Sequence, residues 1–109
     1  MFKPAMLIAV VVLASGCATI DPKAQVAPTY RSISATILSV SCVQCHGVLG
    51  GYSFDTYDHT MKAVSPGDPD SSRLYFVVSK GKMPKLGTKL SAPQVQAIRD
   101  WIIAGAPDN

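Results

Sequence analysis

Five consecutive residues, Cys42-Val43-Gln44-Cys45-His46, constrain this 109-residue chain more than any other feature of its sequence. The C-x-x-C-H spacing places two thiols about one helical turn apart on the same side, with an imidazole directly after the second. Two thiols so placed can form thioethers with the two vinyl groups of one porphyrin, while the histidine reaches the iron. The motif therefore predicts one covalent haem c held by Cys42 and Cys45, with His46 as the proximal iron ligand.

Three other uses of the two cysteines compete with haem attachment. A redox-active C-x-x-C is typical of a βαβ scaffold, and the sequence has no βαβ pattern. A zinc site shared with His46 and His59 would need adjacent residues Cys45 and His46 in one tetrahedron, and a second tight ligand pair is absent. A structural disulfide is the third alternative. The complete five-residue motif favours haem, because it is far more specific than C-x-x-C alone.

The length of the chain also favours a bound cofactor. A domain of this size buries a small apolar area and usually needs a disulfide, a metal or a cofactor to stabilise it. A covalent porphyrin would supply apolar surface for short helices to pack around, so we expect the chain without haem to be poorly folded. The formal net charge of +3 is too small to indicate nucleic-acid binding.

Residues 1–16 have the pattern of a bacterial signal peptide. Lys3 precedes the uncharged run Ala5–Ala14, which is shorter than the roughly 20 residues of a membrane-spanning helix. The stretch Leu13–Cys17 resembles the lipobox of bacterial lipoproteins, in which the cysteine is acylated and becomes the new N-terminus. We therefore expect Cys17 to anchor the chain on the periplasmic side of the cell envelope, and Ala18 after it favours the outer membrane. An ordinary secretory signal with an incidental cysteine is the alternative.

The remaining sequence divides into a tether and one domain. Residues 17–28 contain the acylated cysteine, two prolines and no helical or strand period, which predicts a flexible tether with a span of about 18 Å. Residues 29–109 show apolar residues at helical spacing and no alternation of strand length. The fold class is therefore all-α, with three to four short helices wrapped around one covalent haem.

Local signals mark where these helices begin and end. Thr29 can cap a first helix. Its apolar stripe consists of Tyr30, Ile33, Ile37 and Val40, and Gly47 would stop it. A short helix over residues 54–64 would be capped by Asp55, and the next would start at Asp68 or Ser71. Gly81 would end that third helix, because glycine favours the conformation that closes a helix.

The final helix carries the clearest markers. Ser91 and Gln94 have the spacing of a capping box, and Leu90 and Val95 that of a hydrophobic staple. Gly105, followed by Pro107, marks its end.

An electron-transfer haem needs a second axial ligand, and Met83 is the first candidate. It lies in a loop between two helices, where Pro84 restricts its backbone to extended conformations. His59 and an open sixth position are the alternatives, whereas Met61 stands at a helical position and is expected in the core.

The chain resembles the class I cytochrome c family, and more closely the small planctomycete-type cytochrome c domains, from about residue 33 to residue 106. The resemblance rests on Cys42–His46, Ser65–Tyr75, Gly81–Pro84, Leu90-Ser91 and Trp101–Ala106. It implies a class I cytochrome c-like fold, in which the methionine of the Met-Pro pair, here Met83, is the distal iron ligand. It also implies that the first and last helices cross, with Ile33 and Ile37 packed against Ile98, Trp101 and Ile102.

These features predict a membrane-tethered electron carrier with one haem, serving a redox donor and a redox acceptor. No paired carboxylates, nucleophile–base arrangement or phosphate loop indicate an enzyme. A haem-based sensor with a displaceable distal ligand and a haem subunit of a larger respiratory complex are the alternatives. Four lysines surround Met83 and are candidates for docking acidic partners, the alternative being a basic loop that is merely solvated: Lys80, Lys82, Lys85 and Lys89. Arg73, Tyr52 and Tyr57 are candidates for binding the haem propionates.

Overall fold

A computed structural model describes residues 19–42, 53–84 and 88–109 of the chain. These residues form short helices joined by loops. In chain order the elements are α1 (Tyr30–Ile33), the π-helix η1 (Ser34–Cys42), α3 (Tyr57–Met61), the 3₁₀-helix η2 (Pro69–Ser71), α4 (Arg73–Ser79) and α5 (Ala92–Ile103). These residues contain no strand, which confirms the all-α prediction. None of the helices among them is long and apolar enough to cross a bilayer.

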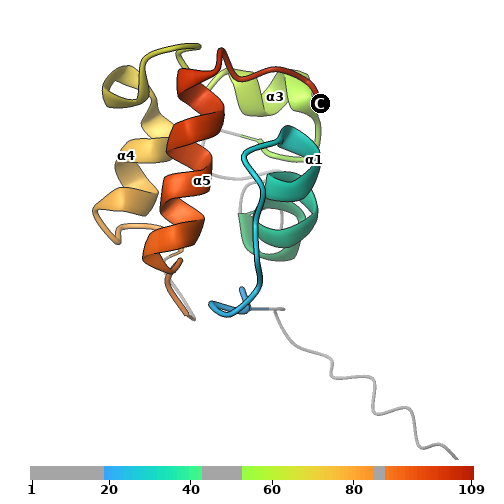
Figure 1. Cartoon of the computed structure of the whole chain (residues 1–109), viewed down its shortest axis with the longest axis vertical. Coiled ribbons are helices and arrows are strands. Elements are labelled where there is room, and N and C mark those ends of the chain that lie inside the picture. The colour runs from blue at the N-terminus through green and yellow to red at the C-terminus, as the bar shows by residue number, and fades with distance from the viewer. Residues whose placement is uncertain (1–18, 43–52, 85–87) are drawn as a thin grey trace, which may run out of the picture.

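The first and last helices pack against each other, as the family resemblance implies. Figure 1 shows α1 beside α5, with α4 on the opposite side of α5. The rings of Tyr30 and Trp101 lie 6.0 Å apart, and Tyr30 also meets Tyr57 edge to face at 5.1 Å. Five fully buried side chains of these two segments share one core cluster: Ile33, Ile37, Ile98, Trp101 and Ile102.

The first helix continues with a π-helical stretch that the apolar spacing does not predict. Thr29 caps its start by accepting a hydrogen bond from the Ser32 amide at 3.2 Å, as expected. From Ser34 onward the chain is π-helical, so its backbone hydrogen bonds join residues five positions apart instead of four. Leu38, five residues after Ile33, is consequently as fully buried as Ile33, while Val40 of the expected stripe is only half-buried.

Two glycines end their helices as the sequence predicts. Gly81 has φ 68° and Gly105 has φ 100°, in the left-handed region where glycine avoids the cost of a side chain. After α5, the amide of Ala106 donates to the carbonyl of Trp101 at 2.9 Å, and that of Gly105 to Ile102 at 2.9 Å. This pair of bonds satisfies carbonyls that the end of the helix would otherwise leave without partners.

The two middle helices begin one residue later than expected. Thr56, not Asp55, caps α3 by accepting from the His59 amide at 3.1 Å. Ser72 precedes α4, while Asp68 caps η2 by accepting from the Ser71 amide at 3.3 Å. The Ser72 side chain makes no capping hydrogen bond to α4; its hydroxyl donates to the carbonyls of Ser65 and Asp68 instead.

The N-terminal segment differs from the flexible tether expected for residues 17–28. Ile20 is 1% exposed and belongs to the core cluster, and Val26 packs against it. The side-chain amide of Gln94 donates to the carbonyls of Asp21 at 2.7 Å and Ala24 at 3.1 Å. The described part of this segment therefore packs against the domain, as Figure 1 shows for the blue coil segment beside α5.

The start of α5 yields a stability prediction. Ser91 accepts from the Gln94 amide and its own amide donates to Gln94 Oε1 at 3.0 Å, which completes the predicted capping box. Ser91→Ala should lower the free energy of unfolding by about 1 kcal/mol, because one amide of the first turn loses its partner. Denaturant unfolding measures this, with the exposed Thr88→Ala as control. Equal losses in both variants would contradict a specific role for the cap.

Candidate haem-binding site

Cys42 is the one residue of the C-x-x-C-H motif within the described chain. It is the last residue of η1, half-buried, and it packs against the core cluster. A cysteine at the end of a helix that is anchored in the core has the placement that the motif requires. Cys45 and His46 lie outside the described residues, so the complete ligand set stays a prediction.

The backbone of Met83 is fixed by the turn that ends α4. The amide of Lys82 donates to Val77 at 2.9 Å and that of Gly81 to Val78 at 3.3 Å, the two bonds of a Schellman motif. The Met83 amide joins them by donating to the same Val77 carbonyl at 3.1 Å. Met83 is half-buried and precedes Pro84 through a cis peptide bond. A thioether on a backbone held this firmly suits a permanent ligand better than one on a free loop.

The two other candidate ligands are engaged elsewhere. Met61, the last residue of α3, is half-buried and packs against the core, as predicted. His59 directs its Nδ1 to Asp55 Oδ1 at 2.6 Å, with both side chains 45% exposed. Among these three described candidates, Met61 packs against the core and His59 contacts a carboxylate. Met83 is therefore the best placed to bind the iron.

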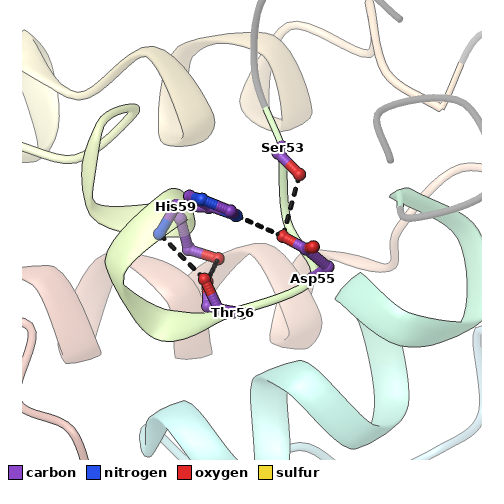
Figure 2. A network of polar contacts seen from close by, with 5 residues as sticks. Ser53, Asp55, Thr56 and His59 are labelled. Atoms are coloured by element: carbon purple, nitrogen blue, oxygen red, sulfur yellow. Dashed lines mark hydrogen bonds and ion pairs between the residues drawn. The ribbon is translucent and has the colours of Figure 1, made fainter. Parts of the chain in front are cut away.

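The Asp55–His59 contact belongs to a polar network at the start of α3, drawn in Figure 2. Asp55 also accepts a hydrogen bond from Ser53 Oγ at 2.8 Å, and the Thr56 hydroxyl accepts one from the backbone amide of His59. The hydrogen bonds from His59 and then Ser53 lower the pKa of Asp55 below its ordinary value of 3.8. The network fixes the chain where it enters α3, directly after residues 43–52.

This network predicts a small acid-dependent contribution to stability. A carboxyl with a lowered pKa in the folded state stabilises the fold above about pH 4, and this contribution disappears as the pH falls through the folded-state pKa. Asp55→Asn should remove that part of the acid dependence and leave stability near neutral pH little changed, because the pair is exposed. The carboxyl titration, followed by nuclear magnetic resonance, should give a pKa below 3.8 that returns toward it in His59→Ala. Asp58→Asn, which replaces an exposed carboxylate in the first turn of α3, is the control.

Three of the four candidate docking lysines are described, and all three are exposed: Lys80, Lys82 and Lys89. Lys82 Nζ lies 4.9 Å from the centre of the Phe76 ring, which the Arg73 guanidinium also approaches at 5.5 Å. Lys89 donates to the carbonyl of Pro84, and Lys85 lies outside the described residues. The contact of these two cations with Phe76 was not predicted from the sequence. The available signal was an aromatic residue in α4 close to Arg73 and Lys82.

Two of the three candidates for binding propionates have partners within the protein. The Tyr57 hydroxyl donates to the carbonyl of Ala106 at 2.7 Å, which ties α3 to the end of α5. Arg73 stacks on Phe76, and Tyr52 lies outside the described residues. Tyr57 thus has a structural role that sequence spacing does not indicate.

A helical domain whose C-x-x-C-H motif begins at the last residue of η1, and whose Met83 backbone is held by a helix-ending turn, has features of a c-type cytochrome. Comparison with known families bears this out: residues 42–87 match the planctomycete cytochrome C family. This confirms the resemblance found in the sequence and indicates a haem-binding, electron-transfer role. No curated protein and no solved structure matches the chain.

Proposed function

We propose that the protein is a membrane-tethered cytochrome that carries single electrons between redox partners in the bacterial cell envelope. The observation that carries this proposal is the complete C-x-x-C-H motif at the head of the segment that matches planctomycete cytochrome C. The residues around it fit haem c in donor chemistry: two thiols, one imidazole and one thioether. The electron-transfer role, rather than catalysis, follows from the absence of a catalytic arrangement in the sequence.

Each ligand residue has a distinct task in this proposal. Cys42 and Cys45 would hold the porphyrin covalently, and His46 and Met83 would be the two ligands of its iron. Haem supplies a one-electron couple, and a histidine–methionine pair leaves no coordination position open to oxygen or peroxide. The turn at Gly81 holds the Met83 backbone, and would hold it in either oxidation state of a bound haem. A fixed backbone at this ligand suits electron transfer, because this part of the site would reorganise little.

The lipid anchor is the second part of the proposal. Residues 1–16 would be removed as a signal peptide, and Cys17 would be acylated and hold the mature chain to the periplasmic side of a membrane, with the outer membrane favoured. Several acyl chains on one residue give stable attachment, whereas a single chain is marginal.

Acidic redox partners are the third part of the proposal. The exposed side chains of Lys80 and Lys82 give the end of α4 a positive charge, to which Lys85 and Lys89 would add. Positive charge near the Met83 loop would raise the association rate with an acidic partner. Electron transfer to such a partner should slow as the salt concentration rises, because salt screens exposed charges. Stopped-flow rates at several ionic strengths measure this, and equal rates at low and high salt would contradict steering.

The test of the proposed function is whether the mature protein carries haem and lipid. The full chain would be produced with a c-type haem maturation system and analysed by mass spectrometry and by its ferric and ferrous spectra. One covalent haem and an acylated N-terminal cysteine are expected. A Cys42→Ser/Cys45→Ser variant should lose the covalent haem and keep the acyl group. Wild-type protein without haem would instead favour the thiol-redox or zinc alternatives.

A further inference from the structure

The turn Asp21–Ala24 is built into the domain rather than free of it. The carbonyl of Asp21 accepts from the Ala24 amide at 3.0 Å, and its carboxylate accepts from the Lys23 amide at 2.9 Å. Gln94 then binds this closed turn with two hydrogen bonds from one amide group. Ile20, directly before the turn, is buried in the core.

Releasing this turn would be costly because Gln94 is itself buried. Gln94 is 1% exposed. Its Nε2 donates to the turn, and its Oε1 accepts from the Ser91 amide. If the turn moved away, Gln94 would lose its hydrogen bonds to two carbonyls, and the buried side chain of Ile20 would be exposed to water. The turn therefore stays docked on the first turn of α5.

A docked turn shortens the connection to the membrane. Three residues of chain lead from Cys17 to Ile20, and even fully extended they reach about 10 Å. A flexible tether over residues 18–28 would let the domain turn in any direction. With Ile20 held in the core, the end of the domain that carries the turn must stay within about 10 Å of the acylated residue.

We propose that the end of the domain formed by the turn Asp21–Ala24 and the first turn of α5 is a membrane-facing surface, held against phospholipid headgroups by the acylated Cys17. This inference rests on the lipid anchor of the proposed function. Lys23 and Asp21 are both exposed on this surface, so the acyl chains of Cys17, and not a net charge of the turn, would hold it at the headgroups.

The test compares the reactivity of two lysines in the acylated holoprotein bound to vesicles of zwitterionic and anionic phospholipids. Lys23 lies on the proposed surface. Lys62 is the C-cap of α3, the helix that Figure 1 shows at the opposite end of the molecule, and both lysines are exposed. The matched variant carries roughly fifteen Gly and Ser residues inserted between Ala18 and Thr19, which lengthens the connection by a flexible span of about 20 Å. The insertion leaves the docked turn and the core unchanged.

Acetylation by a water-soluble reagent, read by mass spectrometry, should be several-fold slower at Lys23 in the wild type than in the insertion variant. Lys62 should react equally in both. Equal reactivity of Lys23 in the two acylated proteins would overturn the proposal of a membrane-facing surface. It would not affect the proposal of a lipid anchor. A mature protein without an acyl group, seen in the same mass spectra, would instead refute the anchor.

A second measurement tests the docking itself. Gln94→Ala should speed hydrogen exchange at the amides of Lys23 and Ala24, and Gln96→Ala, an exposed change on the same helix, should leave it unchanged. Unchanged exchange in Gln94→Ala would overturn the argument that Gln94 holds the turn.

Discussion

Met83→Ala should open the sixth coordination position of the haem. The ferric protein is expected to lose its methionine–iron charge-transfer band, and the ferrous protein should gain the ability to bind carbon monoxide. The reduction potential should fall by on the order of 100 mV, a modest part of the range of about 0.8 V that axial ligands span. The physical reason is that thioether sulfur stabilises ferrous iron and keeps exogenous ligands out.

Met61→Ala is the matched control for the ligand role of Met83. Met61 has the same side chain and is also half-buried, but it packs against the core. Its replacement should lower stability through lost packing and leave both the charge-transfer band and the exclusion of carbon monoxide unchanged. A third variant, His59→Ala, should likewise keep the spectrum, because the His59 ring is directed to Asp55.

The opposite results would change the functional class. If the wild type already binds carbon monoxide and Met83→Ala alters nothing, Met83 is not a firm ligand, and a haem-based sensor becomes the better interpretation. If only His59→Ala changes the ferric spectrum, histidine is the distal ligand and the Asp55 contact must break when haem binds. The three spectra together therefore decide among the alternatives that the sequence leaves open.

Local chemistry accounts for what the sequence predicted well. The cap at Ser91 and the stops at Gly81 and Gly105 depend on contacts within a few residues, so their signals lie in short stretches of sequence. The Met83 loop follows from one of them, because Gly81 sets the turn that positions it. Met61 in the core follows equally from a local helical position.

One contact between distant residues and two unusual local arrangements account for what was missed. Nothing near residue 21 indicates that the buried amide of Gln94 will bind it, since the two are 73 residues apart in sequence. The choice of Thr56 over Asp55 as a cap depends on where His59 and Ser53 compete for the carboxylate. The burial of Leu38 depends on π-helical geometry, which apolar spacing of three and four cannot signal.

Trp101→Ala should be the most destabilising single change among the described residues. Trp101 is fully buried, contacts Tyr30 of the first helix, and donates from Nε1 to the carbonyl of Pro107 at 2.9 Å. Removing a buried aromatic ring of this size costs about 3–5 kcal/mol, through lost burial and the cavity left behind. Natural domains have a total stability of about 5–15 kcal/mol, so the variant should unfold at much lower denaturant concentrations.

Two variants separate the contributions of the Trp101 side chain. Trp101→Phe keeps an aromatic ring in the core and removes the hydrogen bond to Pro107, so its cost should be well below that of alanine. Ile103→Ala, two residues along α5 and 48% exposed, should cost less than 1 kcal/mol, because its side chain is already largely in water. Denaturant unfolding of the holoproteins, followed by far-ultraviolet circular dichroism, measures all three. Because the Trp101 ring lies where α1 meets α5, a small loss in Trp101→Ala would mean that the haem, and not this helix crossing, supplies most of the stability of the domain.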